Sequence, residues 1–262
     1  MLFAGDSYLF CCATENDTTN VLNLLKDFEM AYGEVVNFSK SFVFFSVNTQ
    51  PATRSLICQR MGIQEAKDTS LYLGLICIIG RNKNAILGFL KDKLCKRIQS
   101  WEGGFLSKAG KELLLKMVAQ ALPNHAMLVF LLPLNTCKSL ESTMSKHWWQ
   151  SSKQSRGVTW MSWKKLCKHK NNGGLNFKDL RQYNLALLGK KAWRLLVNES
   201  TLVSRVFKAR YFPNGSFLTA TLGNNPSYVW RSIFEAKDLI TASARKSIAS
   251  GIQTSITEDH WL

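Results

Sequence analysis

The sequence has 262 residues, of which 46% are hydrophobic and 20% charged, proportions typical of a globular protein with a buried core. Its longest apolar runs, residues 71–79 and 126–134, are shorter than the ~20 residues of a membrane-spanning helix, and its N-terminus lacks the basic-then-apolar pattern of a signal peptide, so no membrane partner is expected. Residues 1–80 carry a net charge of −3, with 5 basic and 8 acidic side chains, whereas residues 81–262 carry +19, with 29 and 10. Such a positive field attracts polyanions, most often nucleic acid, although a basic surface that only keeps the protein soluble has the same composition.

The first 80 residues predict short strands with helices over them. The opening stretch "MLFAGDSYLF" favours a hairpin, because Gly5 and Asp6 tolerate turn geometry and apolar residues flank them. Apolar residues at helical spacing predict a helix over 18–31, with Thr18 or Thr19 as its cap and Gly33 at its end. Further on, the patterns predict strands over 34–38 and 42–46 around an Asn-Phe-Ser-Lys turn, a helix over 52–61 behind Pro51, and a strand over 71–79.

Past residue 80 the pattern becomes helical. An amphipathic helix is predicted over 84–101, and its apolar face holds Ile86, Leu90, Leu94, Ile98 and Trp101. Lys93 and Lys96 fall on another face, and Arg97 borders the apolar stripe. Ser107 predicts the cap of a second helix that runs to residue 122 and is stopped by Pro123, with five residues facing inward: Leu113, Leu114, Met117, Val118 and Ala121.

The C-terminal half predicts more helices and no long linker. A helix is expected over 136–149, and Gly173 and Gly174 mark a loop. The strongest periodicity predicts a helix over 179–198, and shorter helices follow over 202–210 and 228–239. The fold class is therefore α+β, with a small partial sheet and helices first and a mostly helical remainder.

Cysteine usage and known catalytic patterns point away from several function classes. Seven cysteines without a CxxC pair indicate a reducing, intracellular environment, with nucleus and mitochondrion both left open. Cys167 and His169 lie close in sequence, but no second ligand pair accompanies them, so a bland surface position is favoured over a zinc site. No Ser-His-Asp pattern, HExxH motif or phosphate-binding glycine loop is found, which disfavours a hydrolase that acts on a small-molecule substrate.

An ordered series of stretches runs along nearly the whole chain. It begins with "FAGDSYLF", "VNFSKSFVFFS" and "YLGL" at 72–75, and continues with "IGRNK" at 79–83, "LSKAGKELLLK" at 106–116 and "HWW" at 147–149. Two longer stretches follow, "GGLNFKDLRQYNLALLGKKAWRLL" and "KARYFPNGSFLTATLGNNPSYVWRSIF". In this order and spacing, the series resembles the reverse transcriptases of plant LINE-type (non-LTR) retrotransposons.

The resemblance implies a division of the chain into three parts. Residues 1–80 resemble the end of the palm, 81–150 the thumb, and 151–262 the helical region before a zinc-binding and RNase H-like part. The earlier palm strand, the fingers and the template grip are expected to be missing from this chain. It is thus expected to be a truncated fragment of an RNA-directed DNA polymerase.

The resemblance also implies that the fragment is catalytically inactive. Intact members of the family hold two magnesium ions with a carboxylate from an earlier palm strand and the first of two paired aspartates. Gly5 stands at the position of that first aspartate, and Asp6 matches the second, less essential one. No cofactor is therefore expected for this fragment, and Asp6 is a catalytic remnant or an ordinary turn residue. Gly5 also disfavours an active polymerase subunit completed by another chain.

For a fragment without catalytic activity, the resemblance still implies non-specific binding to an RNA or DNA duplex. A thumb helix lies along the primer–template duplex, where side chains contact phosphates. The candidate nucleic-acid-binding residues are Tyr72, Gly74, Lys91, Lys93, Lys96, Arg97, Lys108 and Lys111. The alternatives are that Tyr72 is a core residue, that the lysines are only solvated, and that the chain is a co-opted nucleic-acid-binding protein.

Overall fold

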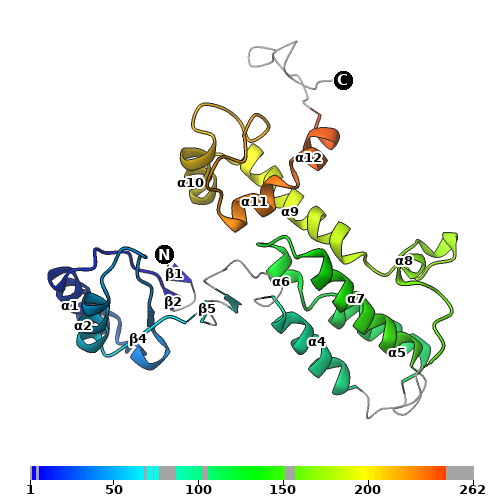
Figure 1. Ribbon diagram of the computed structural model, residues 1–262, viewed down its shortest axis with the longest axis horizontal. Helices are drawn as coiled ribbons and strands as arrows, with labels where there is room; N and C mark the ends of the chain where they lie inside the picture. Colours follow the sequence, from blue (N-terminus) through cyan, green and yellow to red (C-terminus); the bar gives the residue numbers. More distant parts are fainter. Residues whose placement is uncertain are drawn as a thin grey trace. The chain divides into compact units, whose positions relative to one another are not determined.

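The computed structural model describes residues 2–3, 6–67, 70–72, 74–76, 87–101, 106–150 and 157–245 (Figure 1). The chain divides into two compact units, Met1–Ile78 and Ile79–Leu262, and each is described by itself. Three short strand pairs lie in the first unit, whereas the elements of the second are helical, which confirms the predicted α+β class. Among the described residues, no helix is both long and apolar enough to cross a membrane.

Two antiparallel hairpins belong to the first unit. Strands β1 (Leu2–Phe3) and β2 (Asp6–Ser7) pair with Phe3 opposite Asp6, which confirms the predicted hairpin; Gly5 lies outside the described residues. Strands β5 (Leu71–Tyr72) and β6 (Leu75–Ile76) form a second hairpin. The single strand expected over 71–79 is therefore wrong, because Gly74 adopts a φ of 75° and reverses the chain there. Residues 77–79 lie outside the described part.

The third strand pair is parallel. Strand β3 (Phe42–Val43) pairs with β4 (Gln64–Glu65), and helix α2 (Pro51–Met61) makes the connection between them. Helix α2 confirms the helix predicted behind Pro51. The strand expected over 34–38 is wrong, since Phe38–Lys40 forms the 3₁₀ turn η1. The Asn37 carboxamide oxygen accepts from the Lys40 amide at 3.1 Å, and this local bond replaces a strand ladder.

Helix α1 (Glu15–Tyr32) starts earlier than its sequence pattern predicted. The Thr14 hydroxyl, not that of Thr18 or Thr19, accepts from the Asp17 amide at 3.1 Å and caps the helix. Thr18 instead donates its hydroxyl to the Thr14 carbonyl at 2.7 Å. Gly33 ends the helix at a φ of 71°, as predicted. Helices α1 and α2 pack together, and Arg60 pairs with Glu15 across them at 3.2 Å.

One helical group of the second unit is built around α4 (Phe89–Gln99) and α7 (Leu134–Trp149), which pack together. Helix α4 buries Leu90, Leu94 and Ile98, the predicted apolar face, although it begins later than residue 84. Residues 81–86 lie outside the described part. Helix α5 (Lys108–Leu114) also packs on α7 and has the predicted cap, because Ser107 accepts from the Gly110 amide at 3.1 Å.

A π-helical turn, η2 (Leu115–Ala119), follows α5 and changes which side chains are buried. The Gln120 amide donates to the Leu115 carbonyl at 2.9 Å, five residues back. Leu115 and Ala119 are buried, whereas Leu113 is 63% and Met117 67% exposed. The predicted inward face is therefore wrong for Leu113 and Met117, and also for Ala121, which is exposed. The three consecutive leucines at 113–115 allow more than one buried face, and in the structure η2 packs on α4 with Leu115 buried.

The other helical group surrounds α9 (Leu180–Val197), against which α6, α10, α11 and α12 pack (Figure 1). The Asp179 carboxylate caps α9 by accepting from the Gln182 amide at 3.0 Å, so the helix predicted over 179–198 begins one residue later than expected. The helix expected over 228–239 is two helices, because the chain breaks after Phe234. Trp230 is the fully buried centre of this group's core. The remaining helices are α6 (Asn124–Met127), α8 (Trp163–Leu166), η3 (Lys170–Asn172), α10 (Leu202–Tyr211), α11 (Tyr228–Phe234) and α12 (Lys237–Ser243).

A segment without regular structure, residues 130–132, connects the two helical groups. Asn184 of α9 is fully buried; its carboxamide accepts from the Leu132 amide at 2.8 Å and donates to the carbonyls of Met127 and Phe130 at 2.8 and 3.0 Å. Ser232, Tyr228 and Arg181 bond to the backbone of the same segment. Side chains thus satisfy backbone groups that no helix or strand satisfies.

Candidate nucleic-acid interface

Three cationic side chains gather on one face of α4. The helix buries the stripe of Leu90, Leu94 and Ile98 and leaves Lys93, Lys96 and Arg97 exposed. Because residues three and four apart are neighbours on a helix, these cations form one cluster. We call this set, Lys93, Lys96 and Arg97, the α4 cationic face.

The α4 cationic face has no acidic partner in the described part of the chain. Of the ion pairs that the structure describes, none involves Lys93, Lys96 or Arg97. Cations elsewhere do find carboxylates: Lys116, for example, lies 2.6 Å from Glu112 and helps to lower the pKa of that carboxyl group. The exposed carboxylate of Asp92 lies one helical turn before Lys96 but takes part in none of these ion pairs, so the face keeps a net positive charge toward an external anion.

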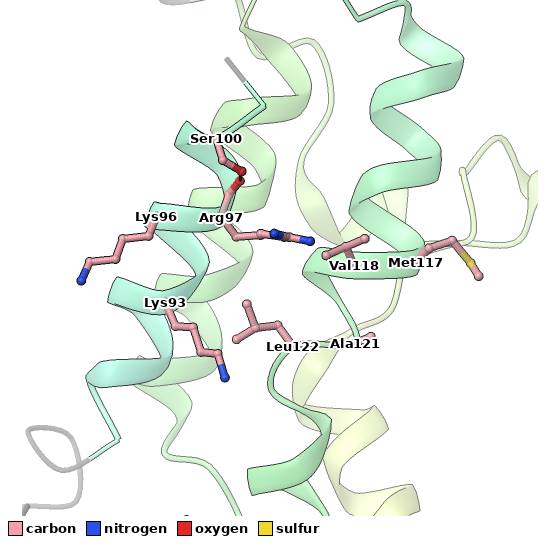
Figure 2. Close-up of a pocket in the computed structure, with 8 residues that line it drawn as sticks. All are labelled: Lys93, Lys96, Arg97, Ser100, Met117, Val118, Ala121 and Leu122. Carbon is pink, nitrogen blue, oxygen red and sulfur yellow. Dashed lines mark hydrogen bonds between the residues drawn. The ribbon is translucent and has the colours of Figure 1, made fainter. Parts of the chain in front are cut away.

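A groove runs between the α4 cationic face and the segment that begins at η2 (Figure 2). Its volume is about 560 Å³, within the range of about 300–1,000 Å³ of ligand sites. In Figure 2, Arg97 extends toward Val118 and Lys93 toward Leu122, whereas the side chains of Lys96 and Met117 point away from the groove. The groove thus has a cationic rim and an aliphatic floor, with the lining residues Lys93, Lys96, Arg97, Ser100, Met117, Val118, Ala121 and Leu122.

Lys108 and Lys111, two of the predicted binding residues, are engaged within the protein. The Lys108 ammonium donates to the Trp148 carbonyl at 2.9 Å and lies 5.0 Å from the centre of the Trp148 ring. Lys111 donates to the Gln150 carbonyl at 2.5 Å. Burial and the neighbouring Lys108 lower the pKa of Lys111. These lysines donate to carbonyls at the C-terminal end of α7, where cations are favourable. They are therefore not part of the α4 cationic face.

Lys91 also lies apart from the α4 cationic face. It projects from the other side of the buried stripe and lines a second, smaller pocket of about 280 Å³. The other residues lining that pocket are Gly88, Asn135, Thr136 and Ser139. The structure therefore brings three of the predicted cations together and separates Lys91 from them.

Comparison with known proteins places the chain among plant sequences. No protein-family model matches it. It is 41% identical over 143 residues to the "Uncharacterized mitochondrial protein AtMg00310" of Arabidopsis thaliana, a match that covers 54% of this chain and 93% of that protein. The chain belongs to the family of that mitochondrial protein.

A second protein that is similar to this chain is much longer than the chain. The chain is 27% identical over 187 residues to the "Putative ribonuclease H protein At1g65750" of Arabidopsis thaliana, a match that covers 67% of this chain but only 29% of that protein. Together, the two relatives are of a kind typical of plant retrotransposon-derived sequences.

The predicted site residues of the palm-like stretch belong to the first unit. Asp6 lies in β2, opposite Phe3, and Gly5 lies outside the described residues. Tyr72 is half-buried, and its ring packs edge-on against Tyr8 with ring centres 5.5 Å apart, as a core residue would. Gly74 is the left-handed turn residue of the β5–β6 hairpin.

The described residues contain no group of three His, Cys, Asp or Glu side chains placed to hold a metal ion. His169 accepts from the Asn171 amide at 3.2 Å, a local cap of η3. Burial raises the pKa of the Cys167 thiol to about 12 and that of Cys137 to about 11. Both thiols are thus poor nucleophiles and poor metal ligands.

Sequence reasoning missed the floor of the groove. Met117, Val118 and Ala121 were expected to face the core, and Leu122 was read only as the end of a helix. The sequence did contain a sign of the observed buried face: Leu115 and Ala119 are four residues apart, a helical spacing as regular as that of the predicted face. The choice between the two faces depends on the π-helical turn, for which the sequence has no clear marker.

Proposed function

We propose that the chain is a retrotransposon-derived reverse transcriptase fragment without polymerase activity that binds duplex nucleic acid without sequence preference. The ordered stretches from "FAGDSYLF" to "VWRSIF" and the two plant relatives support this origin. In this proposal residues 1–80 correspond to the end of a palm, 81–150 to a thumb and 151–262 to the region after it. The binding part rests on one observation: three exposed cations without acidic partners share one face of α4.

The chemistry of the α4 cationic face fits phosphates and not bases. Lysine and arginine at a solvent-exposed helix surface neutralise backbone phosphates and release condensed counterions, which supplies affinity without sequence information. The net charge of +19 on residues 81–262 adds long-range attraction for the same polyanion. Lys108 and Lys111 are not needed, since their ammonium groups already bond to carbonyls at the end of α7.

Duplex binding by the full chain is expected to weaken as salt is raised. Three engaged phosphates give a slope of about −2.7 for log K against log salt concentration on B-form DNA. Fluorescence anisotropy between about 50 and 200 mM salt measures this slope, and duplexes of unrelated sequence serve as the comparison. Equal slopes and affinities across sequences support the proposal. A flat slope, or affinity for one sequence alone, contradicts it.

The purified chain is not expected to extend a primer with magnesium or manganese. Two-metal phosphoryl transfer needs carboxylates that hold both ions about 3.5–4 Å apart, and Gly5 removes one of them from the remnant motif. The residues present therefore do not fit the family's metal pair. Primer extension followed on a denaturing gel tests this expectation. The decisive control is Asp6→Ala: template-dependent extension that is heat-labile and lost in this variant contradicts the proposed inactivity.

A further inference from the structure

The groove beside the α4 cationic face has a feature that duplex binding does not use. Its floor is aliphatic: Val118 and Leu122 are half-buried there, and Ala121 beside them is exposed. The outside of a duplex offers phosphates and sugars, because its base faces are stacked on one another, so a duplex leaves an apolar floor uncovered. An unpaired strand exposes base faces that can cover it.

We propose that this groove binds an unpaired nucleic-acid strand, with its bases against Val118, Ala121 and Leu122 and its phosphates at Lys93 and Arg97. The inference rests on the proposed function, because it assigns the same cations to phosphates, and it adds a strand type and a site. Lys93 and Arg97 extend over the floor, whereas Lys96 points away (Figure 2). The rim and the floor thus lie side by side, as the phosphates and bases of one strand do.

The kinds of side chain in the groove suit nucleobases. An arginine guanidinium is planar and stacks on aromatic rings, and Arg97 has no acidic partner among the described ion pairs. The aliphatic side chains of Val118 and Leu122 offer an apolar surface to a base face. Neither kind of contact distinguishes one base from another, so the groove is expected to accept strands of any sequence.

The test compares a single-stranded oligonucleotide of about 12 nucleotides, within the site sizes of single-strand binders, with a duplex of the same length. Full-length protein carrying Val118→Thr and Leu122→Gln keeps the cations and changes only the floor. Its affinity for the single strand is expected to fall roughly fivefold, from the apolar surface lost, while its duplex affinity stays within about twofold. The matched control is Leu113→Gln, because Leu113 is 63% exposed but does not line the groove. That control should bind both probes as the wild type does.

Each outcome decides the inference. Selective loss of single-strand affinity in the floor variant supports it. Equal changes for both probes, or the same loss in Leu113→Gln, overturn it, while the salt-dependent duplex binding of the proposed function still stands. Absence of binding to either probe overturns both. A glutamate-rich amphipathic peptide is the competing occupant: if the floor variant loses affinity for this peptide but not for the single strand, the groove belongs to a protein partner and the inference is overturned. Circular dichroism of each variant confirms that the protein is folded.

Discussion

Asn184→Ala is expected to lower the free energy of unfolding of the second unit by about 3–4 kcal/mol. The fully buried Asn184 carboxamide is the partner of one backbone amide and two carbonyls in the segment that ends at Leu132. Alanine leaves these groups inside the protein without partners, and each buried unsatisfied group costs about 1–3 kcal/mol. The segment joins the two helical groups, so its loosening is expected to affect both.

Tryptophan fluorescence in urea is the measurement for this prediction. All eight tryptophans occur from Trp101 onward and therefore lie in the second unit, so the signal reports the unit that holds Asn184. Ser232→Ala removes the hydroxyl that accepts from the Leu131 amide and donates to the Tyr228 carbonyl of the same helix, and it should cost about 1–2 kcal/mol. Asn171→Ala changes an exposed asparagine and should leave the midpoint unchanged. Equal midpoints for Asn184→Ala and Asn171→Ala would contradict the role assigned to Asn184.

The helices that sequence predicted best are those with both an apolar stripe and a cap. For α9, the apolar stripe predicted the N-terminus within one residue, and the structure shows that Asp179 caps the helix there, since a capping carboxylate acts locally. Helix α2 begins at Pro51, and Gly33 ends α1 at the predicted position for the same reason. The α4 cationic face was also visible in the sequence, because helical spacing alone places Lys93 and Lys96 together.

The features that sequence could not predict depend on contacts between distant residues. Asn184 lies within an apolar stripe, and nothing near it in sequence indicates that its partners are the backbone groups at 127–132. Strand β3 pairs with β4, and the paired residues, such as Phe42 and Gln64, are 22 positions apart. The local turn pattern therefore predicted the wrong partner for β3. Lys108 and Lys111 read as free cations in the sequence, and only the packing of α5 on α7 brings them to the end of that helix.

Replacing the α4 cationic face is expected to abolish most of the salt dependence of duplex binding. In the variant Lys93→Ala, Lys96→Ala and Arg97→Ala, the log–log slope should flatten by about two to three units, because each phosphate contact contributes about −0.9. The stem of Arg97 borders the apolar stripe of α4, so its loss also removes some packing. The double variant Lys93→Gln and Lys96→Gln leaves Arg97 in place and should flatten the slope by about 1.8 units.

A matched variant distinguishes the effect of the α4 cationic face on duplex binding from the effect of the protein's net charge. Lys164, Lys165 and Lys168 are exposed in and beside α8, and their replacement by alanine removes as much positive charge as the α4 variant does. Long-range attraction alone predicts the same effect for both variants, whereas contact at α4 predicts an effect for only one. Circular dichroism and urea midpoints confirm that the variants are folded.

The most direct test of nucleic-acid binding at α4 is therefore one salt titration of duplex anisotropy on three proteins: the wild type, the α4 variant and the α8 variant. The wild type and the α8 variant are expected to share a slope of about −2.7, and the α4 variant is expected to approach zero. Three coinciding slopes, or a flattened slope in the α8 variant alone, would show that the nucleic acid is bound elsewhere or not at all.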